Sequence, residues 1–341
     1  PPRRRAPDHG GSAMSRLAAG LVALVAALFV ASLVVGPAGI GPAEGLRALV
    51  LGGDGPVSMV MREIRLPRAI LGAAIGAGLG LSGAALQGYL RNPMAEPGLL
   101  GVAGSASLGA VLAIHTGLAA LLPLALPLAA LGGALVGVAL LMALAAGQGG
   151  SLILILAGIA LAQLTAALSA LVLNLSPNPY AAQEIVFWMM GSLADRSMLH
   201  VGLALPVIGL GAAILMGVGR GLDALTLGED AAASMGVGLA RLRWRVVLGT
   251  AAAVGGGVAV AGGIGFIGLV VPHLLRPLAG ARPGRLLWAS ALGGAALLLA
   301  ADIAVRVLLP ARDLKLGVVT ALIGVPLFID MLLRARREGL G

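Results

Sequence analysis

The sequence predicts an all-α integral membrane protein with about ten transmembrane helices. Of its residues, 59% are hydrophobic and only 11% are charged, and the mean hydropathy is +1.03. Apolar runs of about 20 residues, the length that crosses a bilayer, recur along the chain. Because ordinary globular domains carry about 25% charged residues, most of this chain must contact lipid or other apolar helices.

The two ends of the chain lack the pattern of a span. The residues before Met14 show no apolar periodicity. We therefore expect a disordered N-terminal tail over 1–15, a transmembrane domain over 16–337 and a C-terminal tail over 338–341. The first apolar run is longer than the hydrophobic part of a signal peptide and no convincing cleavage site follows it, so we expect a retained span.

Ten apolar runs are candidates for spanning helices, and glycine, proline or charge separates them. They cover residues 17–35, 66–90, 98–114, 118–146, 151–173, 199–218, 244–262, 264–281, 286–309 and 316–334. The fourth run holds Pro123 and Pro127 and should therefore begin with a broken turn.

The charges between the runs predict the orientation. Ten spans leave both termini on one side, and placing them in the cytoplasm puts most Lys and Arg residues there, as the positive-inside rule favours. The second to fifth and the seventh to tenth spans are similar in extent but enter from opposite sides. This arrangement predicts an inverted repeat.

Composition excludes several functions. The formal net charge of +9 follows the loops between spans, so it indicates topology rather than nucleic-acid binding. Cysteine is absent and the four histidines lack ligand spacing, so no protein-built metal site is expected. Lys315 is the only lysine and lies in no phosphate-binding loop, so ATP must bind another chain.

Two other classes of membrane protein fit poorly. An ion-gradient-driven secondary transporter usually carries acids or histidines inside its spans, whereas here Asp302 and Asp330 are the only acids in the runs, both near a span end. An intramembrane enzyme would need a nucleophile beside a base, and no such motif is present. The chain is expected not to be an enzyme.

The longest polar connection, 220–245, contains the short helix candidate LGEDAAASMGV. Glu229 and Asp230 lie in its first turn, where the helix dipole favours acids. The segment is either a surface helix that links two spans or a docking element for a cytoplasmic motor subunit.

Five strings in order along the chain carry a family resemblance. They are RLPR at 65–68, SGAALQGYLRNPMAEPGLLGVAGSASLGA at 82–110, LGEDAAASMGV at 227–237, GFIGLVVPHLLRPLAG at 265–280 and GVVTALIGVPLF at 317–328. Together they resemble the permease subunits of ATP-driven bacterial importers for iron chelates and vitamin B12. The resemblance runs from about Arg16 to Arg337.

This resemblance implies a multi-pass homodimeric permease in the bacterial inner membrane, with its path between two copies of the chain. Its partners would be membrane lipid, a periplasmic substrate-binding protein and two cytoplasmic ATPase subunits that hold ATP and Mg, while this chain binds no cofactor. The coupling segment that contacts the ATPases would comprise Leu227, Gly228, Glu229, Asp230, Ala231, Ala232, Ser234, Met235 and Gly236.

The resemblance also implies that arginines at the outer mouth dock the binding protein. The candidates are Arg65, Arg68 and Arg306. The alternatives are contacts with lipid headgroups and, for Arg306, an i,i+4 bridge to Asp302.

Small or polar residues beside helix breaks predict a cytoplasmic gate. Asn92 and Met94 follow the second span, and Gly150 and Ser151 open the fifth. Plain loop capping is the alternative.

The segment 176–200 is expected to form a short outer helix and a turn into the path. Arg196 is a candidate for contact with a ligand carboxylate, and Met189 and Met190 offer apolar surface, although such methionines usually serve packing. Haem, with two propionates, is favoured as the ligand, followed by a ferric siderophore and then cobalamin.

Overall fold

The computed structural model describes residues 9–122, 124–145, 150–176, 178–280, 282–308 and 314–337, and these residues form helices and connecting loops without a strand. Residues 1–8 and the expected C-terminal tail lie outside the described residues. The first helix begins at His9, so residues 9–15 are helical rather than part of the expected tail.

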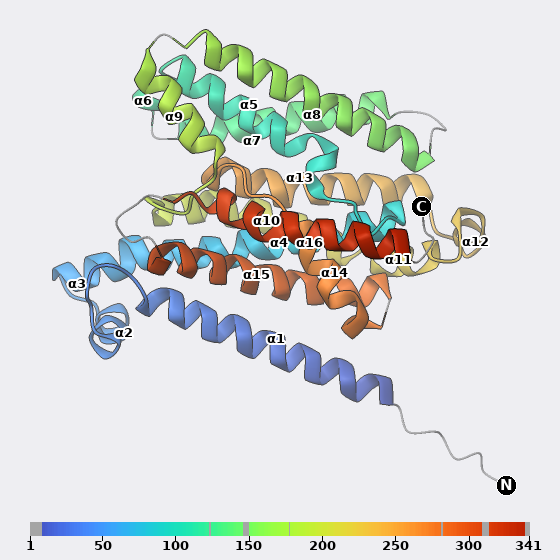
Figure 1. The fold of residues 1–341 in the computed structure, drawn as a ribbon, viewed down its shortest axis with the longest axis horizontal. Helices are drawn as coiled ribbons and strands as arrows, with labels where there is room; N and C mark the ends of the chain where they lie inside the picture. The colour runs from blue at the N-terminus through green and yellow to red at the C-terminus, as the bar shows by residue number, and fades with distance from the viewer. Residues whose placement is uncertain are drawn as a thin grey trace.

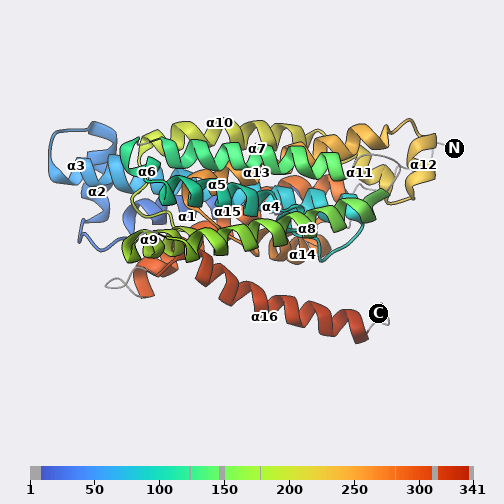
Figure 2. The same ribbon diagram turned by 90° about the horizontal axis from the view of Figure 1, so that it is seen from above.

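Long helices run alongside one another in a bundle (Figures 1 and 2). In chain order the elements are α1 (His9–Val34), α2 (Pro42–Leu51), α3 (Pro56–Met59), the π-helical turn η1 (Val60–Arg65), α4 (Leu66–Leu90), the 3-10 turn η2 (Pro97–Leu100), α5 (Val102–His115), α6 (Leu118–Leu121), α7 (Ala125–Leu144), α8 (Gly150–Asn174), α9 (Pro179–Met189), α10 (Met198–Met216), α11 (Gly219–Leu225), α12 (Glu229–Ser234), α13 (Leu239–Ala261), α14 (Ile267–Ala279), α15 (Pro283–Leu308) and α16 (Leu316–Arg337).

The ten predicted spans correspond to ten apolar segments of this structure. Among the described residues, eight helices are long and apolar enough to cross a membrane, and α5 and α14 are shorter apolar helices. The fourth run begins with the separate turn α6, as its prolines predict. The second span is longer than predicted, because the helical course is continuous from Pro56 to Leu90.

Small residues bring α4 and α15 into backbone contact. A Cβ atom added at Gly80 would overlap the carbonyl oxygen of Ser290, and one at Gly76 would overlap that of Gly294. Glycine permits this approach because it has no side chain, and membrane helices use the same device to increase their packing contact. The two helices therefore form a closely packed seam in the bundle.

A central helix of each half of the chain packs on helices of the other half. Helix α4 of the first half packs on α14 and α15 of the second, while α13 of the second half packs on α5 and α7 of the first. Within each half, the short helix packs on the long helix that follows it, α5 on α7 and α14 on α15. This reciprocal pattern is what an inverted repeat produces.

The elements gather at two ends of the bundle (Figure 1). The first residue of α1, the last residue of α16 and the short helix α12 lie at one end, which we call the α12 end. Helices α2, α3, α6 and α9 lie at the other, the α9 end. Figure 2 gives the same division from above. Both described termini therefore lie at one end, as an even number of spans requires.

Candidate functional site

A buried ion-pair cluster closes the α4–α15 seam at the α9 end. Asp302 is 1% exposed. Its carboxylate pairs with Nη2 of Arg68 at 2.9 Å and with Nη2 of Arg306 at 3.0 Å. The predicted i,i+4 bridge between Arg306 and Asp302 is thus present. Two cations share one carboxylate, so the cluster carries a net positive charge.

Arg65 and Arg306 also bind the end of α1. Arg65 Nη1 donates to the carbonyl oxygens of Leu33 and Val34 at 2.9 and 2.8 Å, and Arg306 Nη1 donates to those of Ser32 and Val35 at 2.9 and 2.8 Å. The last carbonyls of a helix have no partner within the helix and carry negative partial charge. These arginines therefore cap α1.

This geometry differs from what a docking role requires. Arg65 is 4% exposed, and the side chains of Arg68 and Arg306 are 17% and 7% exposed. Each can face a partner only by giving up an internal contact, because all three guanidinium groups point into the protein. Docking through them stays a prediction. Exposed cations at this end include Arg47 and Arg62, and the guanidinium of Arg62 reaches the carbonyl of Leu49 at 3.0 Å.

The predicted gate loop follows α4 at the α12 end. Arg91 ends α4 in the left-handed conformation, and the side-chain oxygen of Asn92 accepts a hydrogen bond from the backbone nitrogen of Met94 at 2.9 Å. This is a local turn with Asn92 exposed and Met94 partly exposed. Gly150 and Ser151 form the first turn of α8, and Ser151 is partly exposed. The capping alternative accounts for Asn92, and the gate stays a prediction.

Two polar residues that the sequence reasoning missed, the buried Gln87 and the partly buried Glu96, tie this loop to α14 and its start. Gln87 is 3% exposed; it donates to the carbonyls of Ala95 at 3.3 Å and Leu269 at 3.2 Å, and it accepts from Arg276 at 2.6 Å. Glu96 accepts from the backbone nitrogen of Phe266 at 2.6 Å. Burial raises the pKa of Glu96, while the hydrogen bond from Phe266 opposes the rise.

Helices α5 and α14 occupy matching positions in the two halves and share a start. Gly101 before α5 and Phe266 before α14 both have left-handed backbone, with φ of 70° and 66°. Each helix is preceded by residues that interrupt the apolar run. In transporters built from repeats, paired interrupted helices of this kind mark the region of the path.

The short helix α12 forms a separate projection at its end of the bundle (Figure 1). It lies between Gly228 and Gly236, both with positive φ. Leu227 and Met235 beside it are 67% and 63% exposed, whereas Ala232 is buried against the bundle. The remaining predicted coupling residues are the exposed Glu229, Asp230, Ser234 and Gly236 and the partly exposed Ala231 and Gly228. Two exposed apolar side chains beside an acidic turn are features of a contact surface.

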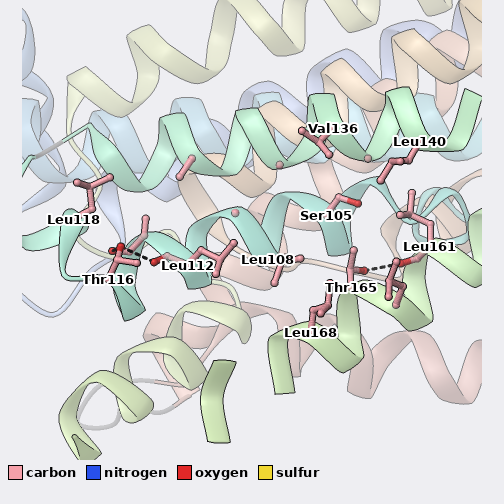
Figure 3. Close-up of a pocket in the computed structure, with 16 residues that line it drawn as sticks. Ser105, Leu108, Leu112, Thr116, Leu118, Val136, Leu140, Leu161, Thr165 and Leu168 are labelled. Carbon is pink, nitrogen blue, oxygen red and sulfur yellow. Dashed lines mark hydrogen bonds between the residues drawn. The ribbon is translucent and has the colours of Figure 1, made fainter. Parts of the chain in front are cut away.

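An apolar cavity of about 500 Å³ opens between α5, α7 and α8 (Figure 3). Leucine, valine, alanine and glycine residues line most of it. The hydroxyls of Ser105, Thr116 and Thr165 point at carbonyls of their own helices, at 2.9, 2.8 and 2.9 Å. Its lining hydroxyls are thus already hydrogen-bonded, so the cavity suits hydrocarbon rather than a polar ligand.

The predicted ligand residues lie at the α9 end. Met189 and Met190 are 40% and 39% exposed, and Arg196 lines a second, polar cavity beside Trp188 and Lys315. The backbone of this loop is held by α16, because Leu316 and Gly317 donate to the carbonyls of Gly191 and Met190 at 2.9 and 3.1 Å. The predicted short outer helix is α9.

A bundle of spanning helices with two interrupted helices in matching positions defines the class of transporter permeases. The model of the FecCD transport family matches residues 24–334. The chain therefore belongs to the FecCD transport family, and the resemblance inferred from its five strings is confirmed.

Relatives of known name cover most of the chain. The Fe(3+) dicitrate transport system permease protein FecD of Escherichia coli strain K12 is 40% identical over 277 residues, 81% of this chain and 86% of that protein. The vitamin B12 import system permease protein BtuC of Vibrio parahaemolyticus is 39% identical over 282 residues, 81% and 83% of the two chains.

A solved structure supports the same fold. It is described as an inward-facing conformation of a metal-chelate type ABC transporter, and it superposes with a TM-score of 0.81 at 33% identity. The match covers 92% of this chain and 98% of that one. The architecture is thus that of a membrane-spanning permease of the ATP-driven importer class.

Proposed function

We propose that this chain is the permease subunit of an ATP-driven importer that carries an iron chelate from the periplasm to the cytoplasm. The observation that carries the proposal is α12, a short helix with exposed Leu227 and Met235 at the end where both described termini lie. In a chain without a phosphate-binding loop, such a projection is suited to receive the motion of a separate ATPase.

The assembly would contain two copies of this chain, two ATPase subunits at the α12 ends and a binding protein at the α9 ends. Charge supports this orientation. Arginines gather at the α12 end, and the positive-inside rule assigns such an end to the cytoplasm. They are Arg91 after α4, Arg220 in α11, Arg241, Arg243 and Arg245 in the first turns of α13, Arg276 in α14, and Arg282 and Arg285 around the start of α15.

Transport would follow alternating access. The chelate enters from the α9 end, and ATP binding and hydrolysis on the partner subunits move α12 and the helices joined to it. The loop with Asn92 and Met94 and the start of α8 at Gly150 and Ser151 would open last, as the gate. No covalent chemistry on this chain is required, because the step is a change of conformation.

Haem is the first cargo to test, because its propionates suit Arg196 and its ring suits the exposed Met189 and Met190. Ferric citrate is the second, because a relative 40% identical is named for ferric dicitrate transport. Cobalamin is the third, and relatives about 40% identical are named for it.

The test is reconstitution of the permease, its ATPase and its binding protein in liposomes. ATP-dependent uptake of haem, ferric citrate and cyanocobalamin is measured in parallel, with an ATPase variant that cannot hydrolyse ATP as the control. Uptake of one cargo by the active complex alone supports the proposal. Uptake driven by an ion gradient without ATP would contradict it in favour of a secondary transporter.

A further inference from the structure

A polar recess lies at the α9 end, outside the apolar cavity of Figure 3. It has a volume of about 220 Å³, and its lining comes from Leu126 in α7, from α9, from the loop between α9 and α10, and from Lys315 before α16. The charged and aromatic side chains in the lining are Glu184, Phe187, Trp188, Asp195, Arg196 and Lys315. The continuous stretch 184–196 thus meets two distant residues, Leu126 and Lys315, and two cations lie around one cavity.

Two residues that line this recess each carry a buried donor without an acceptor from the protein. Trp188 is 8% exposed and its indole Nε1 makes no hydrogen bond. The Nε atom of Arg196 is also buried without a hydrogen-bond partner. Indole and guanidinium nitrogens can only donate. Buried polar groups are nearly always hydrogen-bonded, so an occupant that presents oxygen acceptors would satisfy both nitrogens once the two side chains turn toward it.

The charges of the recess favour an anion in its inner part. Glu184 and Asp195 are exposed at its rim, whereas Arg196 is partly buried, and burial lowers its pKa with Asp195 opposing the shift. Lys315 lies over the ring of Phe187, with Nζ at 4.9 Å from the ring centre. The acids lie nearer solvent than the orphaned donors, so they leave the inner part cationic.

We infer that this recess binds a carboxylate of the transported chelate, with Trp188 and Arg196 donating to its oxygens and Lys315 adding positive charge. The inference rests on the proposed function and narrows its cargo to chelates that carry carboxylates. Arginine is suited to this task because its planar donors match a carboxylate. A volume of about 220 Å³ admits one carboxylate-bearing arm, so the metal centre stays in the wider path.

The first experiment measures ligand binding at the recess in the absence of transport. The permease dimer is placed in lipid nanodiscs with Trp244 and Trp288 changed to Phe, so that Trp188 is the only tryptophan, and is titrated with gallium citrate, which carries carboxylates around a redox-inactive metal. We expect a saturable change in emission that weakens at least tenfold in Arg196→Gln and in part in Arg196→Lys. No saturable change, or an equal titration in Arg196→Gln, overturns the inference.

The second experiment measures uptake in the complete reconstituted complex. Arg196→Gln should lower ATP-dependent uptake of haem or ferric citrate at least tenfold, and Arg196→Lys should retain part of it. Arg16→Gln, an exposed arginine in α1 at the other end of the bundle, serves as the matched control. Import of cyanocobalamin alone by the unmodified complex overturns the carboxylate inference and leaves the permease function standing. Failure of the unmodified complex to import any cargo counts against the proposed function. The titration alone then tests whether the recess binds a carboxylate.

A third variant tests the charge of the recess. The charge of Asp195 acts on Arg196, so Asp195→Asn removes a carboxylate that competes with a bound anion and should tighten the gallium citrate titration about two- to threefold. An unchanged or weakened titration overturns the inference.

Discussion

Arg68 and Asp302 lie 234 positions apart in the chain and meet in a buried pair. Nε of Arg68 donates to Oδ1 and Oδ2 of Asp302 at 2.9 and 3.1 Å, and Nη2 lies 2.9 Å from Oδ1. The pair joins α4 of the first half to α15 of the second, where the glycine seam ends. Because Arg306 shares the carboxylate and caps α1, one acid holds three helices together.

Asp302→Asn should destabilise the protein strongly. The substitution keeps the shape of the side chain but leaves Arg68 and Arg306 as buried cations without a counter-ion, a change that costs about 3–5 kcal/mol in other buried pairs. We expect a clear fall in the midpoint of thermal unfolding in detergent. Glu63→Gln, an exposed acid in η1, is the control and should leave the midpoint unchanged. Equal midpoints for the two variants would show that the cluster does not stabilise the fold.

Gly133→Ala should disturb the seam between α5 and α7, whereas Gly132→Ala beside it should not. A Cβ atom at Gly133 would overlap the carbonyl oxygen of Ser105, while one at Gly132 meets nothing within 4 Å. Overpacking typically costs about 1–3 kcal/mol. The midpoint of thermal unfolding of each variant in detergent tests this pair, and a lower midpoint for Gly132→Ala than for Gly133→Ala would refute the packing argument.

Leu227→Ser and Met235→Ser should weaken the association with the ATPase. Both side chains are exposed beside α12, and burial of such a side chain in an interface is worth about 1.5–3 kcal/mol. We therefore expect roughly a tenfold loss of affinity for each, measured by pull-down of the ATPase on permease nanodiscs. Ala233→Ser on the exposed face of the same helix is the control. Unchanged binding in both variants would remove α12 from the interface.

Glu96 should make stability depend on pH. Burial raises the pKa of Glu96 in the folded protein above its ordinary value of 4.5, so the folded state favours the protonated form. The stabilising contribution is complete below about pH 4.5 and is lost as the pH rises through the elevated folded pKa. The difference in unfolding midpoint between the unmodified protein and Glu96→Gln should decrease as the pH is raised from about 4 to about 8. A constant difference across that range would contradict the raised pKa.

The capping of α1 predicts a local effect. Arg65→Gln removes both hydrogen bonds to Leu33 and Val34 and should release the end of α1 rather than unfold the bundle, because α1 is the least buried of the candidate spans. Amide hydrogen exchange should rise at 30–36 and stay unchanged in α13. Arg62→Gln, whose guanidinium reaches α2 instead, is the control. Equal exchange at 30–36 in both variants would argue against the cap.

The sequence by itself determined the membrane class, the ten apolar segments, the family and the short helix of the coupling segment. Each of these depends on a property that is local in the chain. The length of an apolar run shows whether it can cross a bilayer. Prolines predicted the break before α7, and the acids at 229 and 230 predicted the first turn of α12.

Only the tertiary structure decided which polar side chains are available to a partner protein or a ligand and which are held by internal hydrogen bonds. Arg65, Arg68 and Arg306 were predicted from the sequence to face a partner, yet their guanidinium groups bind Asp302 and the end of α1. Gln87 and Glu96 gave no local signal, because their partners in α14 and just before it lie more than 160 positions away. The recess around Trp188 and Arg196 likewise joins α9 to Lys315. Hydrogen bonds between residues so far apart in sequence depend on where the helices cross. The glycine seams of the folded bundle determine those crossings, and no local pattern along the chain predicts them.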